Sequence, residues 1–293
     1  MSAPTLAIDN LDLSFKGLLS RTQVLHGVTL TVEPGERVAL VGESGSGKSV
    51  LARLVLGLLQ DQRGVEVSGR IDFAGTELDQ LSRAARRALR GRDMSMIFQD
   101  PTSSLNPMFT IGNQFHAVLQ RRETDLGGER AHETARSWLD RVAIPDTDRV
   151  LASYPFQLSG GMNQRVMIAM ALANNPSLLL ADEPGTALDV TVQAQTLELM
   201  RKLAEDVGTA VLFISHNLGV VREFADRVYV IHRGHIVESG QTADVFGNPG
   251  HPYTRALLAA IPRITGEGIP DLPEQIDLSH PPVHHNTGSA DHG

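Results

Sequence analysis

The sequence predicts an α/β fold in which helices cover a mostly parallel β-sheet. Short apolar runs that are typical of buried strands alternate with longer helical patterns along most of the chain, and this alternation is typical of parallel sheets. A mainly helical block at about 107–173 separates the first strand patterns from the later ones, which predicts an inserted helical subdomain. Hydrophobic residues make up 41% of the 293 residues, which is enough for a sizeable core.

The first part of the chain predicts a small β region. Apolar and polar residues alternate partly at Leu6–Phe15, and a second strand pattern follows at Val24–Val32. Further strand patterns lie at Gly69–Phe73 and Met94–Phe98, and the Arg/Ala/Leu-rich stretch Leu81–Arg92 between them favours a helix.

A glycine-rich loop stands between a short apolar strand pattern, Arg37–Val41, and an apolar helix pattern, Val50–Leu59. Its spacing fits the phosphate-binding P-loop, in which backbone N–H groups at a helix N-terminus surround an anion. Lys48 is expected to reach the β- and γ-phosphates of a nucleotide, and the Ser49 hydroxyl to ligate Mg²⁺. The expected phosphate-binding residues are Gly42, Glu43, Ser44, Gly45, Ser46, Gly47, Lys48 and Ser49.

Polar side chains follow two later strand patterns. Ser177–Ala181 ends in Asp182 and Glu183, and a carboxylate at the C-terminal end of a parallel strand can face the ligand crevice. Asp182 is suited to hold Mg²⁺, and Glu183 to polarise a water that attacks the γ-phosphate. The strand pattern Thr209–Ser215 is followed by His216, for which a structural role and a contact with the γ-phosphate both remain open.

The last part of the chain changes in character. A strand pattern at Arg227–His232 and helical patterns at Val190–Asp206 and Leu218–Ala225 precede a Gly/Pro/His-rich end beyond Pro262. We expect residues 266–293 to form a loosely ordered tail. The alternative for the tail is weak metal binding by His280, His284, His285 and His292.

Composition excludes several classes of protein. The net charge of −8 leaves no basic footprint for nucleic acid, and the absence of cysteine excludes disulfides and cysteine-ligated clusters. Met1–Thr5 lacks the basic and apolar regions of a signal peptide, and no apolar run approaches the roughly 18 residues of a membrane span. We therefore expect a soluble protein whose membrane role, if it has one, depends on a partner.

The stretch Leu158–Arg165, Leu-Ser-Gly-Gly-Met-Asn-Gln-Arg, resembles the signature sequence of ABC-transporter ATPases. The other motifs occur in that family's order, and the resemblance extends from about Leu6 to Pro262. It implies an ABC ATPase domain at about 1–265, with a RecA-like P-loop NTPase core, an N-terminal antiparallel β region and the inserted helical subdomain. It also implies ATP and Mg²⁺ as ligands, and nucleotide binding by Ser159, Gly160 and Gly161 of one subunit across a dimer interface.

The resemblance assigns roles to further residues. Gln99 resembles the glutamine of the Q-loop, which senses Mg²⁺ as a ligand and couples to the membrane subunit. Ala187-Leu188-Asp189 resembles the D-loop at the dimer interface, and His216 matches the switch histidine. Phe15 is the candidate for stacking on adenine, although a core role is an equal alternative.

A narrower resemblance points to the peptide/nickel import branch. It rests on stretches such as Thr186–Ala194 and on His251–Leu258, which lies in a C-terminal extension at about 245–265. Gly185 stands where this branch often has threonine, and Asn163 where it often has arginine. The cysteine-rich tail that some members use for an iron–sulfur cluster is absent.

The resemblance implies an ATP-hydrolysing subunit of an importer for peptides or a related small solute such as nickel. Its partners would be transmembrane permease subunits, an identical or paralogous second ATPase subunit and, indirectly, an extracytoplasmic solute-binding protein. It would bind the cytoplasmic face of the membrane through the permeases. The alternatives are a non-transport ABC ATPase that acts on nucleic acid or ribosomes, which the charge disfavours, and the nucleotide domain of an exporter.

Overall fold

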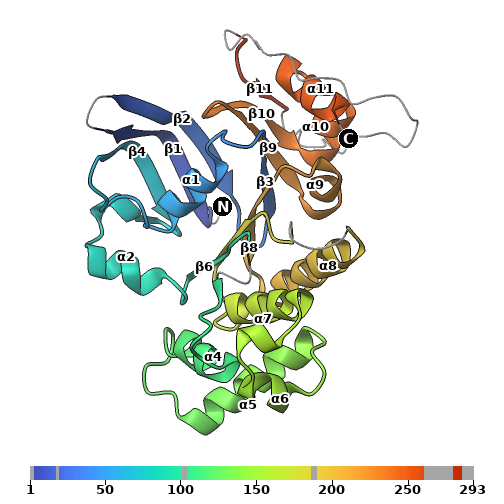
Figure 1. The fold of residues 1–293 in the computed structure, drawn as a ribbon. Helices are drawn as coiled ribbons and strands as arrows, with labels where there is room; N and C mark the ends of the chain where they lie inside the picture. The colour runs from blue at the N-terminus through green and yellow to red at the C-terminus, as the bar shows by residue number, and fades with distance from the viewer. Residues whose placement is uncertain (1–2, 18–19, 101–103, 186–189, 261–279, 286–293) are drawn as a thin grey trace, which may run out of the picture.

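The computed structural model describes residues 3–17, 20–100, 104–185, 190–260 and 280–285 (Figure 1). Its strands are β1 (Leu6–Lys16), β2 (Arg21–Val32), β3 (Arg37–Val41), β4 (Val65–Phe73), β5 (Thr76–Glu77), β6 (Met94–Ile97), β7 (Leu178–Asp182), β8 (Ala210–Ser215), β9 (Arg227–His232), β10 (His235–Gln241) and β11 (Val283–His284). Its helices are α1 (Lys48–Val55), α2 (Arg83–Leu89), α4 (Ile111–Leu119), α5 (Gly128–Arg141), α6 (Thr147–Ala152), α7 (Gly160–Leu172), α8 (Val190–Val207), α9 (Leu218–Phe224), α10 (Thr242–Gly247) and α11 (Pro252–Ala259), with 3-10 turns at Leu78–Gln80 and Pro155–Gln157.

The main sheet has the strand order β11-β10-β9-β3-β8-β7-β6. Strands β9, β3, β8, β7 and β6 run parallel, whereas β10 is antiparallel to β9. A second, antiparallel sheet has the order β2-β1-β4-β5. These two sheets, together with the helices inserted between β6 and β7, confirm the predicted fold class.

The central strands are buried on both faces, and their alternate residues belong to two different cores. Val38 and Leu40 of β3 pack with apolar residues of the antiparallel sheet and of α1. Ala39 and Val41 pack with the helices on the other face of the sheet. Successive side chains of a strand point to opposite faces, so the short run Arg37–Val41 serves both cores.

Helices α4 to α7 form the lower part of the molecule in Figure 1. Phe115 of α4 and Leu139 of α5 are fully buried there, and α7 packs against both the helices and the main sheet. The boundaries of about 107 and 173 that we expect for a subdomain stay a prediction.

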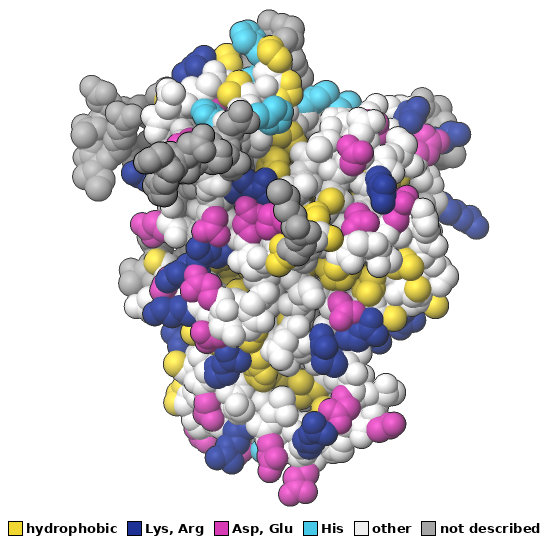
Figure 2. Space-filling model, turned by 180° about the vertical axis from the view of Figure 1, so that it is seen from behind, with side chains coloured by type: hydrophobic (Ala, Val, Ile, Leu, Met, Phe, Trp, Pro, Cys, Tyr) yellow, Lys and Arg dark blue, Asp and Glu magenta, His cyan; other side chains and the backbone are white. Residues whose placement is uncertain are grey.

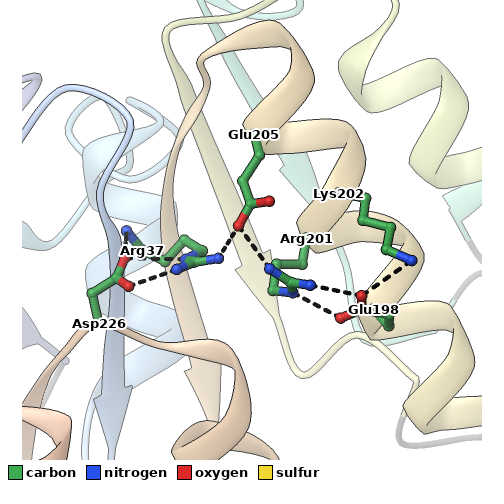
Figure 3. Close-up of polar contacts among 6 residues, drawn as sticks. All are labelled: Arg37, Glu198, Arg201, Lys202, Glu205 and Asp226. Carbon is green, nitrogen blue, oxygen red and sulfur yellow. Dashed lines mark hydrogen bonds and ion pairs between the residues drawn. The ribbon is translucent and has the colours of Figure 1, made fainter.

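A chain of ion pairs connects α8 to Arg37 at the N-terminal end of β3 (Figure 3). Arg37, the first residue of β3, pairs with Asp226, which directly precedes β9, and with Glu205 of α8. Glu205 also pairs with Arg201, one helical turn earlier. Three separate elements thus meet at one arginine.

The C-terminal region differs from the predicted loosely ordered tail. Val283 and His284 form β11, which pairs in parallel with Glu238 and Ser239 of β10. Within 266–293, residues 280–285 are therefore ordered against the sheet, and for them the expectation of a loose tail is wrong. A two-residue strand is too short to show a periodic pattern in sequence. Figure 2 shows histidines gathered over this end of the molecule, and acidic and basic side chains interspersed elsewhere on that face.

Two helix boundaries also differ from expectation. Helix α1 ends at Val55 instead of Leu59, because Gly57 turns the chain with a positive φ of 70°. Helix α2 begins at Arg83, where the Ser82 side chain caps it by accepting from the Ala85 N–H. Among the described residues, no helix is long and apolar enough to cross a membrane.

Candidate functional site

The glycine-rich loop joins β3 to α1, as predicted. Gly47 caps the helix with φ of 104°, and a Cβ there would lie 2.8 Å from a Leu25 methyl, so glycine is needed. The Lys48 side chain turns back over the loop. Its Nζ donates to the carbonyl oxygens of Gly42 and Glu43, at 2.8 and 2.6 Å. Carbonyl groups of the loop therefore hold the Lys48 ammonium group near the N-terminus of α1.

Two carboxylates at the end of β7 lie beside this loop. The Ser49 hydroxyl donates to Asp182 Oδ1 at 2.9 Å. Glu183 follows with φ of +48°, a left-handed conformation that is costly for a residue with a side chain and is common at functional sites. Its Oε2 accepts from Gln99 Nε2 at 3.0 Å, and its Oε1 lies 2.8 Å from His216 Nδ1.

The electrostatics of the site favour an anionic ligand. Burial lowers the pKa of Lys48, although the charges of Glu183, Asp182 and Glu43 oppose that shift. Burial also raises the pKa of Asp182, against the hydrogen bond from Ser49. An oxygen-rich anion over the loop would offer charged acceptors to the buried ammonium, which here donates to two carbonyl oxygens.

A cavity of about 200 Å³ opens at this point. It is lined by Val24, Ser44, Gly45, Gly47, Lys48, Ser49, Val50, Gln99 and Glu183. Residues of four separate segments thus converge on one cavity. The sequence did not predict that Val24 would line this cavity, because an apolar residue in a strand pattern has no feature that indicates a binding site. Phe15, by contrast, is half-buried against the core beneath the antiparallel sheet and does not line the cavity.

The signature residues lie elsewhere. Ser159 caps α7, where its hydroxyl oxygen accepts from the Met162 N–H at 3.3 Å. Gly160 and Gly161 open the same helix. None of the three lines the cavity within this chain. The D-loop prediction at Ala187–Asp189 lies outside the described residues.

Two of the described histidines near the end of the chain contact residues of β10. Among the described residues, no group of three or more His, Cys, Asp or Glu side chains could hold a metal ion. His284 Nδ1 contacts the Ser239 hydroxyl, and His285 Nε2 contacts Glu238. These two histidines are thus engaged with β10, and His292 lies outside the described residues.

Sequence reasoning also missed Tyr253, which belongs to α11. This residue is fully buried, and its hydroxyl accepts from the backbone N–H of Glu43 in the glycine-rich loop at 3.0 Å. The two residues are 210 positions apart, and no motif links them.

Comparisons with solved structures agree with this geometry. The dimeric structure of a post-hydrolysis state of the ATP-binding cassette MJ0796, bound to ADP and Pi, matches with a TM-score of 0.71 and 27% identity over 81% of this chain and 98% of that one. The ABC transporter protein cbiO1 from Clostridium perfringens matches with a TM-score of 0.69 and 25% identity, over 84% of this chain and 91% of that one.

Curated relatives are more similar in sequence. The oligopeptide transport ATP-binding protein OppD of Bacillus subtilis is 44% identical, over 94% of this chain and 78% of its own length. The glutathione import ATP-binding protein GsiA of Escherichia coli is also 44% identical over 94% of this chain. The chain spans only 45% of the length of GsiA.

Family models match in two places. The ABC transporter model covers residues 25–186, which include the glycine-rich loop, the signature and the two carboxylates. The model of the oligopeptide/dipeptide transporter C-terminal region covers residues 237–288, which include β10, α11 and β11. The chain therefore belongs to the ABC transporter family, and it carries the C-terminal region found in oligopeptide and dipeptide transporters.

Proposed function

We propose that this chain is the ATP-hydrolysing subunit of an ABC importer, and that it couples ATP binding and hydrolysis to the uptake of peptides or of a related small solute such as nickel. One observation carries the proposal: Lys48 and Glu183 line the same cavity. The Glu183 carboxylate is held there by contacts with Gln99 and His216. The transport function in the name of OppD and the import function in the name of GsiA favour uptake over action on nucleic acid or ribosomes.

The loop residues 42–49 bind the phosphates of ATP. Backbone N–H groups at the start of α1 offer donors and the positive end of the helix dipole. Lys48 exchanges its carbonyl partners for β- and γ-phosphate oxygens, because a charged acceptor makes the stronger hydrogen bond.

Mg²⁺ fits the oxygen-donor set beside the loop. The Ser49 hydroxyl and the Asp182 carboxylate are hard ligands already in contact, and the Gln99 side chain offers a third oxygen. The bound ion would neutralise negative charge on the phosphates.

Glu183 accepts the proton of the attacking water. Its carboxylate is held on both oxygens, so its direction is set by Gln99 and by His216. An ionised carboxylate only accepts hydrogen bonds, so Nδ1 of His216 carries the proton in this contact. His216 could reach the γ-phosphate through its other ring nitrogen, which must also carry a proton to donate to a phosphate oxygen.

Two variants test these roles separately. Lys48→Ala is expected to weaken ATP binding about 10- to 100-fold, since hydrogen bonds to charged groups contribute about 1.5–3 kcal/mol. Lys202→Ala is the matched control, because the side chain of that lysine is 64% exposed and pairs with Glu198 at the surface. Glu183→Gln is expected to keep ATP binding and to abolish phosphate release. Hydrolysis by Glu183→Gln at the parent rate would contradict the assigned role.

Ser159, Gly160 and Gly161 act in trans, on ATP held by the second subunit. They do not line their own chain's cavity, and the start of α7 provides donors for a phosphate. Among the described residues, a Cβ at Gly161 would meet a Val192 methyl at 3.7 Å, an ordinary contact, so Gly161→Asp should keep the fold but place negative charge where a phosphate must bind. It should abolish ATP-driven dimerisation of the Glu183→Gln protein in sedimentation, whereas Gly161→Ala should retain it. Normal closure of Gly161→Asp with permeases bound would exclude the trans role.

The remaining partners follow from the same proposal. Permease subunits bind the chain to the cytoplasmic face of the membrane, the second ATPase subunit is identical or paralogous, and a solute-binding protein delivers the solute from outside. Uptake by vesicles containing the complete complex tests this. Peptide or nickel uptake should require ATP on the side of this subunit, and uptake that continues with Glu183→Gln in every subunit would refute the coupling.

A further inference from the structure

A residue of the C-terminal region holds the glycine-rich loop. The Tyr253 hydroxyl oxygen accepts from the Glu43 N–H at 3.0 Å. The carbonyl of the same peptide unit belongs to Gly42, and it accepts from Lys48 Nζ at 2.8 Å. The Gly42–Glu43 peptide therefore lies between the tyrosine and the lysine and is hydrogen-bonded at both ends, so each bond polarises the other.

The position of Tyr253 is itself tightly determined. The side chain is fully buried, and its ring packs on His232 of β9 with the ring centroids 4.0 Å apart. The Tyr253 N–H donates to Nδ1 of His251, which caps α11. Burial raises the pKa of the phenol, so the hydroxyl stays neutral across the physiological range.

A buried carboxylate fixes the start of α11. Glu238 of β10 is fully buried and accepts from the N–H groups of Gly250 and His251, at 2.7 and 3.1 Å. Its Oε1 also lies 2.7 Å from Nε2 of His285, which follows β11. The polar network therefore runs from β11, through Glu238 and α11, to the Tyr253 hydroxyl.

We propose that Tyr253 is a positioning residue for the nucleotide loop, and that the Glu238 network holds it in place. Without the hydroxyl, the Glu43 N–H loses its acceptor, and the peptide is free to rotate toward another one. Rotation would also move the Gly42 carbonyl, which accepts from Lys48 before ATP binds, and change the shape of the loop that the phosphates must fit. The C-terminal region thus supports ATP binding through the backbone of the loop. This inference rests on the proposed function, because it assumes that the loop binds ATP.

Tyr253→Phe tests the proposal with a minimal change. Phenylalanine keeps the ring packing on His232 and removes only the hydroxyl. The probe is a non-hydrolysable ATP analogue with Mg²⁺, and the dissociation constant is expected to rise about fivefold to tenfold, within the range for an unpaired buried donor.

Tyr229→Phe provides the matched control. The Tyr229 hydroxyl also accepts from a backbone N–H, that of Thr31 at 3.1 Å, as well as from Nη1 of Arg227 at 3.1 Å, but Thr31 is in β2 and not in the loop. A merely structural role for Tyr253 would make the two variants alike. The proposal expects both to lose stability and only Tyr253→Phe to lose affinity.

The possible results distinguish failure of the Tyr253 positioning role from failure of the proposed function. Unchanged affinity in Tyr253→Phe, or an equal loss in both variants, would overturn the positioning role while leaving the proposed function intact. Failure of the parent protein to bind the analogue would overturn the proposed function instead. If Tyr253→Phe does not fold, amide hydrogen exchange of the parent protein without nucleotide replaces it. The Glu43 amide should then be protected at least tenfold relative to an unstructured peptide, and an unprotected amide would overturn the proposal.

Discussion

Arg37 provides a test of what holds α8 against the main sheet. Its guanidinium donates to both carboxylate oxygens of Asp226, with Nε 3.0 Å from Oδ2 and Nη2 2.6 Å from Oδ1. It also pairs with Glu205 (Figure 3). The Arg37 side chain is only 19% exposed, so solvent screens these contacts less than those of a surface pair. We predict that Arg37→Met, which keeps much of the aliphatic stem, destabilises the fold.

The expected loss in the free energy of unfolding lies in the lower part of a range of about 1.5–3 kcal/mol. Hydrogen bonds to charged groups contribute about that much, whereas exposed ion pairs contribute about 0–1 kcal/mol. The upper part of the range is not expected, because Asp226 is 41% exposed and regains water when its partner is removed.

Urea unfolding at pH 7 measures this loss, with Lys202→Met as the control. Lys202 pairs with Glu198 at 3.3 Å on the exposed side of the same helix, and pairs of that kind contribute about 0.3–0.5 kcal/mol. Equal midpoints for the two variants would refute the claim that Arg37 joins three elements of the fold.

The pH dependence gives a second test of the same pair. Burial raises the pKa of Asp226, but the hydrogen bonds and the charge of Arg37 outweigh burial and place the pKa below its ordinary value of 3.8. A depressed pKa contributes stability that is present above the unfolded value and is lost as the pH falls through the folded value. The difference between parent and Arg37→Met should thus be constant from about pH 7 to 5 and shrink below about pH 4. A difference that grew on acidification would contradict this assignment.

Three further tests, two of them with a control variant, concern the packing, a helix cap and a turn. Phe213→Ala in β8 should cost about 3–5 kcal/mol of unfolding free energy, because the ring is 1% exposed and packs on Phe224; Phe156→Ala, at a site 72% exposed, should change it by less than about 0.5 kcal/mol. Thr110→Ala should cost about 1 kcal/mol in thermal unfolding, because it removes the cap that accepts from the Asn113 N–H. Gly234→Ala should lower the melting temperature more than Gly35→Ala, since both have positive φ but only the Cβ at 234 would clash, 2.1 Å from the Val24 carbonyl oxygen.

The order of strands and helices could be predicted from the sequence because the main sheet is buried on both faces. Such strands are short, continuous apolar runs, and Arg37–Val41 and Leu178–Asp182 match the predicted positions closely. The polar residues that follow these runs converge as expected, since parallel strands end at one edge of the sheet. The geometry thus brings Lys48, Asp182 and Glu183 together beside one cavity.

Contacts between distant segments could not be predicted in this way. The Tyr253 contact joins the loop to a helix near the end of the chain, and a single buried tyrosine has the same local pattern as any other core residue. The strand β11 gains its order from Glu238 and Ser239 of β10, and its own composition resembles that of a loose tail. Both the Tyr253 contact and the order of β11 depend on residues far away in the sequence. Such tertiary contacts produce no periodic pattern that a local sequence analysis could detect.

Two tertiary contacts lie near opposite ends of β3, and we expect one to affect stability and the other nucleotide binding. At its first residue, Arg37 fixes the strand to Asp226 and α8. Just beyond its last residue, Tyr253 fixes the loop to the C-terminal region. Four strand residues, Val38–Val41, follow Arg37 before the loop begins, which is roughly 13 Å at about 3.3 Å per residue and exceeds the 7–10 Å over which mutational effects usually couple. Changes at Arg37 should therefore alter the free energy of unfolding without altering nucleotide affinity, whereas the Tyr253 hydroxyl acts on the peptide that contacts Lys48. The same strand thus carries a stability contact at one end and a binding contact at the other, and the two can be measured independently.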